Sequence, residues 1–282
     1  MERPIRSIHN SHYSTIEGLK TYRPLPSSSL DNLDPFLFLN HHGPQDYNAV
    51  NAGLPFGPHP HRGFETLTFI FNGDVVHQDS NGFKSTIEAG GVQWMTAGSG
   101  LLHSEISSEK FKNEGGNLEI IQLWMNLPSQ LKMVDPNYQG FQKNDLILHQ
   151  REGATTHLIA GQIEGKVGPA KSLTDLTMMY IDFEKNAQTV FEVGQEEQIL
   201  FYLVNGKLEV NRKEINTNQL VQFGMDGEEI NVRALEKSRI IFGHGIPFNE
   251  PIVAQGPFVM NTREEIMQAM QDYQSGKMGV WN

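Results

Sequence analysis

Short apolar stretches interrupted by Asn-Gly pairs recur in this chain and predict a protein built from β-hairpins. Residues 68–77 form an apolar strand, an Asn-Gly pair and a second strand, and residues 201–210 repeat that order. Asn-Gly between two such strands is a strong short-range signal of a hairpin. Similar segments follow each pair, at residues 90–94 and 218–223. The chain therefore reads as two similar β-domains in tandem.

Sheets made of short strands usually close into barrels or jelly rolls, because closure hides their unpaired edges. We therefore predict an all-β fold with two barrels. Regular structure is interrupted within residues 127–155, where Pro128 and Asp135-Pro136 occur. The predicted division is into an N-terminal domain of residues 1–135 and a C-terminal domain of residues 136–282.

One helix is predicted at the C-terminal end. Thr262 and Glu265 have the spacing of a capping box, in which each side chain hydrogen-bonds the backbone N–H of the other residue. Apolar side chains follow at helical spacing, at Ile266, Ala269, Met270 and Tyr273. The helix should end near Gly276. We expect this stripe to pack in the core and not to bind a cofactor.

Composition narrows the classes of function. The chain has 282 residues, enough to bury a full core, and it has no cysteine, which excludes thiolate catalysis and zinc–thiolate sites. Its net charge of −11 argues against direct binding to nucleic-acid phosphates. Residues 1–6 lack the apolar core of a signal peptide, and no apolar run reaches membrane-spanning length. We expect a cytoplasmic protein that binds neither nucleic acid directly nor a membrane.

Two pairs of candidate metal ligands occur in the first half, His59-Pro60-His61 and His103-Ser104-Glu105. Residues two apart on a β-strand point to the same face, so each pair can direct both side chains into one cavity. Three imidazoles and one carboxylate would then face a single ion. A ligand set without sulfur suits Fe(II), Mn, Ni, Cu(II) or Zn.

The carboxylate ligand has a second candidate, Glu65. An unbroken strand would give Glu65 the same parity as His59 and His61, and would point it at the metal. Gly63 could instead form a bulge that turns Glu65 away. Glu65 would then be a supporting residue, or an exposed strand carboxylate, and Glu105 would be the ligand.

The surroundings of these pairs resemble the two signature motifs of the cupin superfamily. Gly53 lies six positions before the first histidine, and the glycine-rich residues 98–102 lead into His103. The chain departs from the motifs in several places. Gly98 stands where a proline is usual, and Glu105 stands near the usual asparagine.

These departures resemble one branch of the superfamily, the pirin family. The resemblance rests on NLDPF at residues 32–36, HPHRGFET at 59–66, QWMTAG at 93–98, LWMNL at 123–127 and GPFVMNT at 256–262. It implies a bicupin, which is two tandem cupin β-barrels, with a short C-terminal helix. The domain of residues 1–135 would bind the metal, and residues 136–282 would form a cupin-like domain without a metal site.

The resemblance also implies a ligand set. In pirins the carboxylate ligand comes two residues after the third histidine, which favours Glu105 over Glu65. The implied ligands are His59, His61, His103 and Glu105. One divalent transition metal per chain follows, with Fe(II) as the first candidate and Mn, Ni, Cu and Zn as the others. Glu105 would be both a ligand and the catalytic base.

Pirins resemble quercetin 2,3-dioxygenases, so the first functional hypothesis is a non-haem Fe(II) oxidoreductase with a small aromatic, flavonol-like substrate. In that chemistry the flavonol 3-hydroxyl binds the metal, a carboxylate takes its proton, and dioxygen opens the ring with release of carbon monoxide. The alternative is a metal-dependent, redox-sensitive regulator that docks to a protein partner, either a transcription factor or a metabolic enzyme. Other cupin chemistry, such as isomerisation or decarboxylation, uses similar ligands.

The remaining histidines are predicted to have ordinary roles. The second half has no His-x-His ahead of its Asn-Gly pair, and residues 191–195 stand in that region. Three isolated histidines in that half should be surface or hydrogen-bonded residues, namely His149, His157 and His244. In the first half, neither His41 nor His42 is expected to be a ligand, and His77 with Asp79 should lie on a solvated strand face. The aromatic and apolar residues that flank the candidate site in sequence are Phe56, Trp94 and Met95, which we expect mainly to pack in the core.

Overall fold

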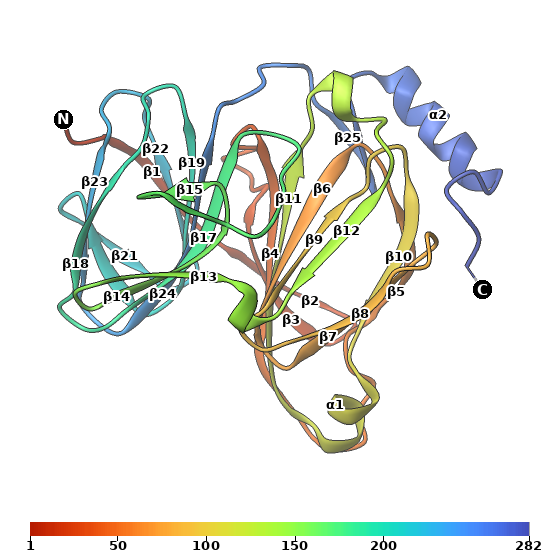
Figure 1. Ribbon diagram of the computed structural model, residues 1–282, viewed down its shortest axis with the longest axis horizontal. Coiled ribbons are helices and arrows are strands. Elements are labelled where there is room, and N and C mark those ends of the chain that lie inside the picture. The colour runs from red at the N-terminus through yellow and green to blue at the C-terminus, as the bar shows by residue number, and fades with distance from the viewer. Residues whose placement is uncertain (282) are drawn as a thin grey trace. The chain divides into compact units, whose positions relative to one another are not determined.

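A computed structural model of the chain describes residues 1–281 (Figure 1). The strands form two sets of sheets. The first set has a seven-stranded sheet in the order β12-β9-β6-β11-β4-β3-β2 and a four-stranded sheet in the order β5-β10-β7-β8. The strands of this set are β2 (His12–Ile16), β3 (Leu19–Leu25), β4 (Phe36–Tyr47), β5 (Phe56–His61), β6 (Phe64–Asn72), β7 (Asp74–Asp79), β8 (Lys84–Glu88), β9 (Val92–Thr96), β10 (Leu101–Ile106), β11 (Gly116–Asn126) and β12 (Asn137–Phe141).

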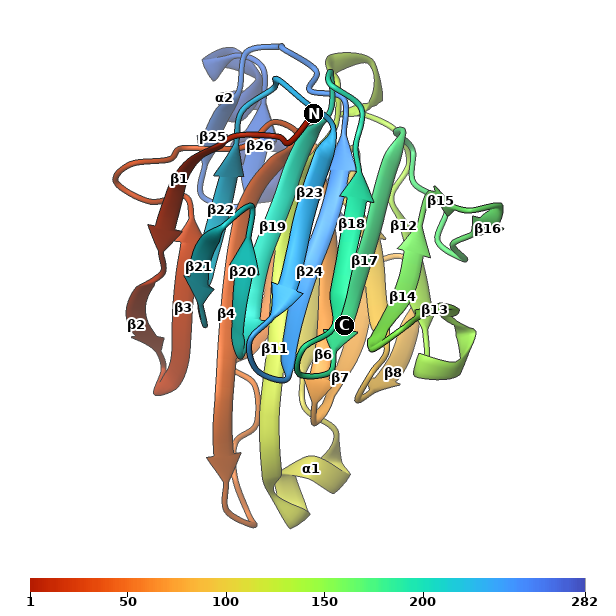
Figure 2. The same cartoon turned by 90° about the vertical axis from the view of Figure 1, so that its left-hand side faces the viewer.

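The second set repeats this arrangement. Its seven-stranded sheet has the order β1-β22-β19-β24-β17-β14-β13, and its four-stranded sheet has the order β18-β23-β20-β21 (Figure 2). The strands of this set are β1 (Ile5–Asn10), β13 (Ile147–Arg151), β14 (Ala154–Ala160), β17 (Leu176–Phe183), β18 (Gln188–Glu192), β19 (Gln198–Asn205), β20 (Lys207–Val210), β21 (Lys213–Asn216), β22 (Gln219–Phe223), β23 (Glu229–Ala234) and β24 (Ser238–Gly245). In strand order, β18 therefore corresponds to β5, and β23 corresponds to β10.

The remaining elements are short. They are the two-stranded sheets β15 (Gln162–Ile163) with β16 (Lys166–Val167) and β25 (Val253–Gln255) with β26 (Phe258–Met260), the helices α1 (Glu109–Glu114) and α2 (Arg263–Gln274), and the 3₁₀ turns Ser129–Leu131 and Lys143–Asp145. Among the described residues, no helix is long and apolar enough to cross a membrane.

The two Asn-Gly pairs do not form the predicted hairpins. β6 and β7 flank Asn72-Gly73 but lie in different sheets, and so do β19 and β20 around Asn205-Gly206. Only the glycines of these pairs have positive φ, +79° and +90°. A type I′ hairpin turn needs positive φ at both residues, so each pair instead turns the chain from one sheet into the other. The repeat itself was predicted correctly.

The compact units of the structure are discontinuous in sequence. One comprises residues 1–12, 22–36 and 146–247, and the other comprises residues 13–21, 37–145 and 248–282. The first unit includes the N-terminal segment because β1 pairs with β22, with Ile8 opposite Val221. These units differ from the contiguous division at residue 135, because strand pairing and not sequence order decides where each terminal segment packs.

The capping box of α2 is present as predicted. The Thr262 hydroxyl accepts the backbone N–H of Glu265, and the Glu265 carboxylate accepts the backbone N–H of Thr262. Ile266 and Ala269 are buried in a cluster with residues of β26. Tyr273 is 40% exposed, so the predicted apolar stripe packs only in its first turns.

Candidate metal centre

The histidines of the two predicted pairs meet on adjacent antiparallel strands. β5 carries His59 and His61, and β10 carries His103 directly opposite His59. One ring nitrogen from each of the three side chains lies within 4.8 Å of the others. The ring centroids are 4.4 Å apart for His59 and His103 and 4.9 Å apart for His61 and His103. The alternation of strand side chains and this register together create the cluster.

Burial keeps two of these imidazoles, His61 and His103, neutral. His61 is 2% exposed and His103 is fully buried. Burial, followed by the charge of His59, lowers the pKa of His61 to about 3. Burial and the neighbouring histidines likewise hold the pKa of His103 well below its ordinary value. Neutral imidazoles retain a lone pair, which is the form that binds a metal.

Backbone carbonyls determine which nitrogen faces the cluster. His59 Nδ1 lies 2.7 Å from the Gly57 carbonyl oxygen, and His61 Nδ1 lies 3.3 Å from that of Pro257. Because a carbonyl oxygen only accepts, each Nδ1 must carry its hydrogen, and the lone pair is then on Nε2. Such contacts orient histidine ligands in metal sites. Among the described residues, His61 Nε2 and both ring nitrogens of His103 have no hydrogen-bond partner, as expected of atoms that bind a metal.

Glu105 lies beside this cluster, but it is not one of the residues whose ligand atoms lie within 4.8 Å of one another. The strand pairing of β10 with β5 shifts between His103 and Glu105, and Glu105 is 2% exposed. Its carboxylate accepts hydrogen bonds from the Thr68 hydroxyl and from the side-chain amides of Gln93 and Gln122. All three donors are neutral, so they orient the buried negative charge without neutralising it. A divalent ion at the histidines would supply the missing positive charge.

Glu65 is buried on the other face of β6. Thr68 contacts Glu105, and Glu65 lies three positions earlier on the same strand, so its side chain points to the opposite face. Gly63, with φ +89°, separates β5 from β6 and breaks the parity with the histidines. The Thr96 hydroxyl donates to Glu65 over 2.6 Å, and burial raises the pKa of Glu65 to about 7. The exposed alternative for Glu65 is therefore wrong, and the geometry supports the structural role.

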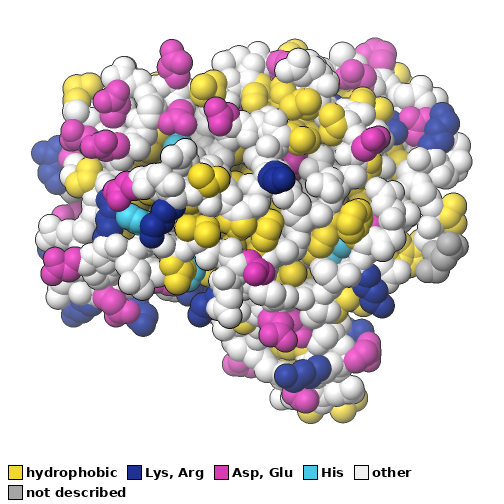
Figure 3. All heavy atoms as spheres, in the orientation of Figure 1, with side chains coloured by type: hydrophobic (Ala, Val, Ile, Leu, Met, Phe, Trp, Pro, Cys, Tyr) yellow, Lys and Arg dark blue, Asp and Glu magenta, His cyan; other side chains and the backbone are white. Residues whose placement is uncertain are grey.

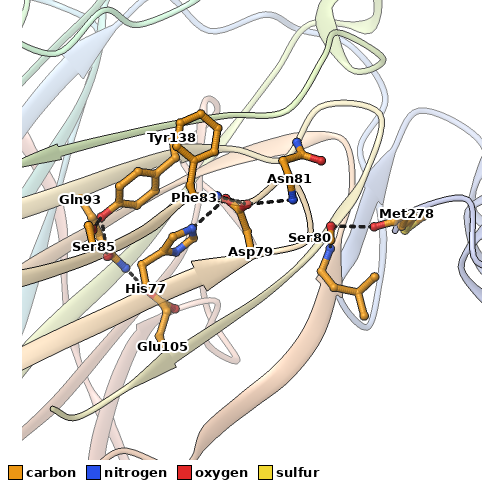
Figure 4. Close-up of polar contacts among 11 residues, drawn as sticks. His77, Asp79, Ser80, Asn81, Phe83, Ser85, Gln93, Glu105, Tyr138 and Met278 are labelled. Atoms are coloured by element: carbon orange, nitrogen blue, oxygen red, sulfur yellow. Dashed lines mark hydrogen bonds and ion pairs between the residues drawn. The ribbon is translucent and has the colours of Figure 1, made fainter. Parts of the chain in front are cut away.

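His77 and Asp79 of β7 are buried next to the cluster, so the prediction of a solvated strand face was wrong. His77 Nε2 lies 2.9 Å from Asp79 Oδ2. The His77 ring stacks on Tyr138 at 4.1 Å and lies 5.5 Å from the His103 ring. Figure 4 shows His77 and Asp79 beside Tyr138 and Glu105. The available signal was alternation, because His77 shares its strand face with the fully buried Val75.

The aromatic wall of the site includes Phe64, which follows His61 by three residues, and Trp124, which is distant in sequence. The Trp124 ring lies 5.2 Å from His61 and 4.4 Å from Phe64. Trp94 and Met95 are buried core residues, as expected. His41 pairs with Glu119 over 3.1 Å, and the Thr21 hydroxyl lies 2.8 Å from a ring nitrogen of His42. These two contacts are consistent with the expectation that neither His41 nor His42 is a ligand.

Two family profiles match the chain: Pirin over residues 18–125, and the pirin C-terminal cupin domain over residues 178–279. The chain belongs to the pirin family. Pirin-like proteins of Solanum lycopersicum and Caulobacter vibrioides are each 36% identical to it, and the matches cover 93% and 92% of this chain and 88% and 93% of those proteins. The crystal structure of quercetin 2,3-dioxygenase from Acinetobacter baumannii has a TM-score of 0.92 at 34% identity and covers 99% of both chains. The predicted all-β pirin bicupin with a C-terminal helix is confirmed.

Proposed function

We propose that the chain is a metal-dependent dioxygenase of the quercetin 2,3-dioxygenase type. The observation that carries this proposal is the group of three imidazoles on β5 and β10, in which the buried His61 and His103 have ring nitrogens without a hydrogen-bond partner. The quercetin 2,3-dioxygenase of Acinetobacter baumannii is 34% identical to this chain over nearly its whole length, which supports the same chemistry here.

The proposed ligands are His59, His61, His103 and Glu105. Nitrogen and oxygen donors without sulfur fit a divalent transition metal, and we propose Fe(II), with Mn, Ni, Cu and Zn as ions that the same donors accept. When bound, a redox-active ion of this kind supplies the electron transfer that lets dioxygen react with an organic enolate. Four protein ligands leave two positions of an octahedral ion for exchangeable groups, which distinguishes this set from a closed structural site.

Glu105 is the proposed general base for the 3-hydroxyl of a flavonol. The amides of Gln93 and Gln122 hold its carboxylate from two sides, one at each oxygen, so the group is already oriented when substrate arrives. Thr68 donates to the same oxygen as Gln93. A proton taken from the substrate would remain on Glu105 and return to the product.

The aromatic wall is proposed to orient the substrate. Trp124 stacks on Phe38 with centroids 4.5 Å apart, and Phe64 continues the wall toward His61. Flat aromatic surfaces bind flat aromatic ligands by offset or edge contacts. The wall would also exclude water from the face of the rings where oxygen reacts.

The test is anaerobic reconstitution with Fe(II), followed by aerobic incubation with quercetin while flavonol loss and carbon monoxide are measured. His59→Ala and Glu105→Ala are the variants. Loss of flavonol that needs iron, oxygen and both residues supports the proposal. Stoichiometric metal binding without flavonol consumption contradicts it and favours a metal-dependent regulator. Full metal affinity in Glu105→Ala contradicts the assignment of Glu105 as a ligand.

A further inference from the structure

The barrel without the His-x-His pair contains a cavity of about 540 Å³. Its lining comes from β13, β14, β17, β18, β24 and the β15–β16 hairpin. A volume of this size is in the usual range for small-molecule sites, which combine an apolar lining with a few fixed polar groups. The cavity lies wholly within the unit that contains residues 146–247.

The cavity occupies a position related to that of the metal centre in the other barrel. β18 has the same place in its four-stranded sheet as β5 has in the other, and it lines the cavity. Where β5 carries His59 and His61, β18 presents Thr189 and Phe191. Neither side chain is a good metal ligand, and among the described residues the histidines and carboxylates that line this cavity do not form a metal-binding group.

One side of the cavity is apolar and partly aromatic. Met179, Ile181 and Phe242 are buried in the barrel core, and each lines the cavity. Phe191 stacks on Phe242 with centroids 4.6 Å apart and an interplanar angle of 24°. Stacked rings at the side of an apolar space favour a flat, unsaturated group.

The Glu164 carboxylate already contacts a cationic side chain at the edge of the cavity. The Arg151 guanidinium donates to Glu164 Oε1, and His149 Nε2 lies 3.5 Å from Glu164 Oε2. Arg151 is held in place because its Nε donates to His149 Nε2 over 3.2 Å and its Nη1 donates to the Val190 carbonyl over 3.3 Å. On the face drawn in Figure 3, histidine side chains (cyan) are visible among basic (dark blue) and acidic (magenta) side chains. A fixed guanidinium is the protein group best suited to a carboxylate.

Glu164 lies on a hairpin that can move away from Arg151 at a small cost in free energy. Its side chain is 58% exposed, and its backbone has a φ of +45° at the tip of the β15–β16 hairpin. Only two residue pairs join the strands of that hairpin, Gln162 with Val167 and Ile163 with Lys166. Segments with few buried contacts and little pairing open locally at a small fraction of the global stability.

We propose that this cavity is a second binding site, specific for a small aromatic carboxylate. The ring of the ligand lies against Phe191 and Phe242, and its carboxylate replaces that of Glu164 on Arg151. Glu164 thereby acts as a built-in competitor, and the hairpin that carries it acts as a lid. This inference is independent of the metal centre and of the proposed dioxygenase activity.

The probe is 1-naphthoate, with the uncharged 1-naphthamide as its matched control. Both are titrated into full-length protein loaded with Zn(II), which is diamagnetic, and methionine methyl NMR signals are followed. We expect naphthoate to shift the Met179 methyl signal and to leave that of Met260, near α2 in the other unit, unchanged. Equal binding of the amide, or a Met260 shift without a Met179 shift, would overturn the proposal.

Variants of Glu164 and Arg151 test whether the Glu164 carboxylate competes with the ligand for Arg151. Glu164→Gln should tighten naphthoate binding about three- to tenfold, because an ionic competitor is lost, whereas Arg151→Met should weaken it about tenfold or more. Arg151→Lys is the second variant if Arg151→Met does not fold, and it should also weaken binding because the fork geometry is lost. Glu209→Gln, which disrupts an exposed pair with Arg233 in the same unit, is the control and should have no effect. Weaker binding in Glu164→Gln, or unchanged binding in both Arg151 variants, would overturn the proposal.

Discussion

In one barrel the strands β5 and β10 bring three imidazoles together, whereas in the other barrel the corresponding strand β18 presents Thr189 and Phe191 to an open cavity. The strand orders of the two barrels are the same. Their chemistry differs because a few side chains on corresponding strands differ. The comparison teaches that one strand order can carry a histidine cluster in one barrel and an open cavity in the other, depending on the residues of β5, β10 and β18.

The largest expected effect is on metal binding. His103→Ala should lower the affinity for Fe(II) by about 3–4 kcal/mol, if a binding free energy of the usual size is shared among four ligands. His244→Ala, in the cavity of the other barrel, is the matched control and should leave one metal per chain. Calorimetric titration under anaerobic conditions measures both. Binding of a second metal by the wild-type protein, or loss of metal from His244→Ala, would contradict the prediction that only one barrel binds metal.

The next largest effect is the dependence of the free energy of unfolding on pH that Glu65 causes. Burial raises the pKa of Glu65 from 4.5 to about 7 in the folded protein. Between these values the folded state binds more protons than the unfolded state, so the contribution of Glu65 to stability falls as the pH rises through this window, and it stays lost above it.

Glu65→Gln removes this pH-dependent contribution to stability, because the amide does not titrate. The free energy of unfolding of Glu65→Gln, relative to wild type, should increase by about 2–3 kcal/mol from pH ~4.5 to pH ~7.5. Urea unfolding at a series of pH values measures the difference. Glu209→Gln, an exposed carboxylate in the other barrel, should run parallel to wild type. Parallel curves for Glu65→Gln would contradict the buried, protonated state of this carboxyl group.

A smaller effect is expected from two glutamines on the corresponding strands β9 and β22. Gln93 on β9 donates to Glu105, whereas Gln222 on β22 lies 3.0 Å from a ring nitrogen of His9. Gln93→Leu should lower flavonol turnover about tenfold with little loss of metal, because the base is no longer oriented. Gln222→Leu should leave turnover unchanged. Equal effects of the two variants would show that Gln93 acts only on stability.

The smallest predicted effect concerns α2. Thr262→Ala removes one half of the capping box and should lower the free energy of unfolding by about 1 kcal/mol. Thermal unfolding measures it. Metal stoichiometry should not change, because the cap lies at the start of the helix and not on β5 or β10. Loss of metal in this variant would show that the helix supports the metal centre.

Local features of the fold were predictable because they depend on neighbouring residues. The capping box needs only the spacing of Thr262 and Glu265, and the shared face of His59 and His61 needs only the twofold period of a strand. The duplicated pattern of strands was also visible in the sequence. The Asn-Gly pairs were found correctly but were assigned the wrong turn, because a sheet-to-sheet corner and a hairpin can have the same residues.

Features of the site that depend on distant segments were not predictable. His77 lies beside His103 because β7 pairs with β10, and Trp124 reaches His61 from β11. The cavity next to Arg151 results from five strands and a hairpin whose side chains do not fill the barrel. No sequence window contains these segments together.

The order of residues along this chain was sufficient to specify its strand faces, its helix cap, its repeat and the two pairs of candidate ligands. Which strands lie side by side, which carboxylate is turned away from the histidines, and which barrel interior stays open depend on long-range pairing. The physical reason is that side-chain direction follows from the local backbone period, whereas burial and proximity follow from contacts between segments that are far apart in sequence.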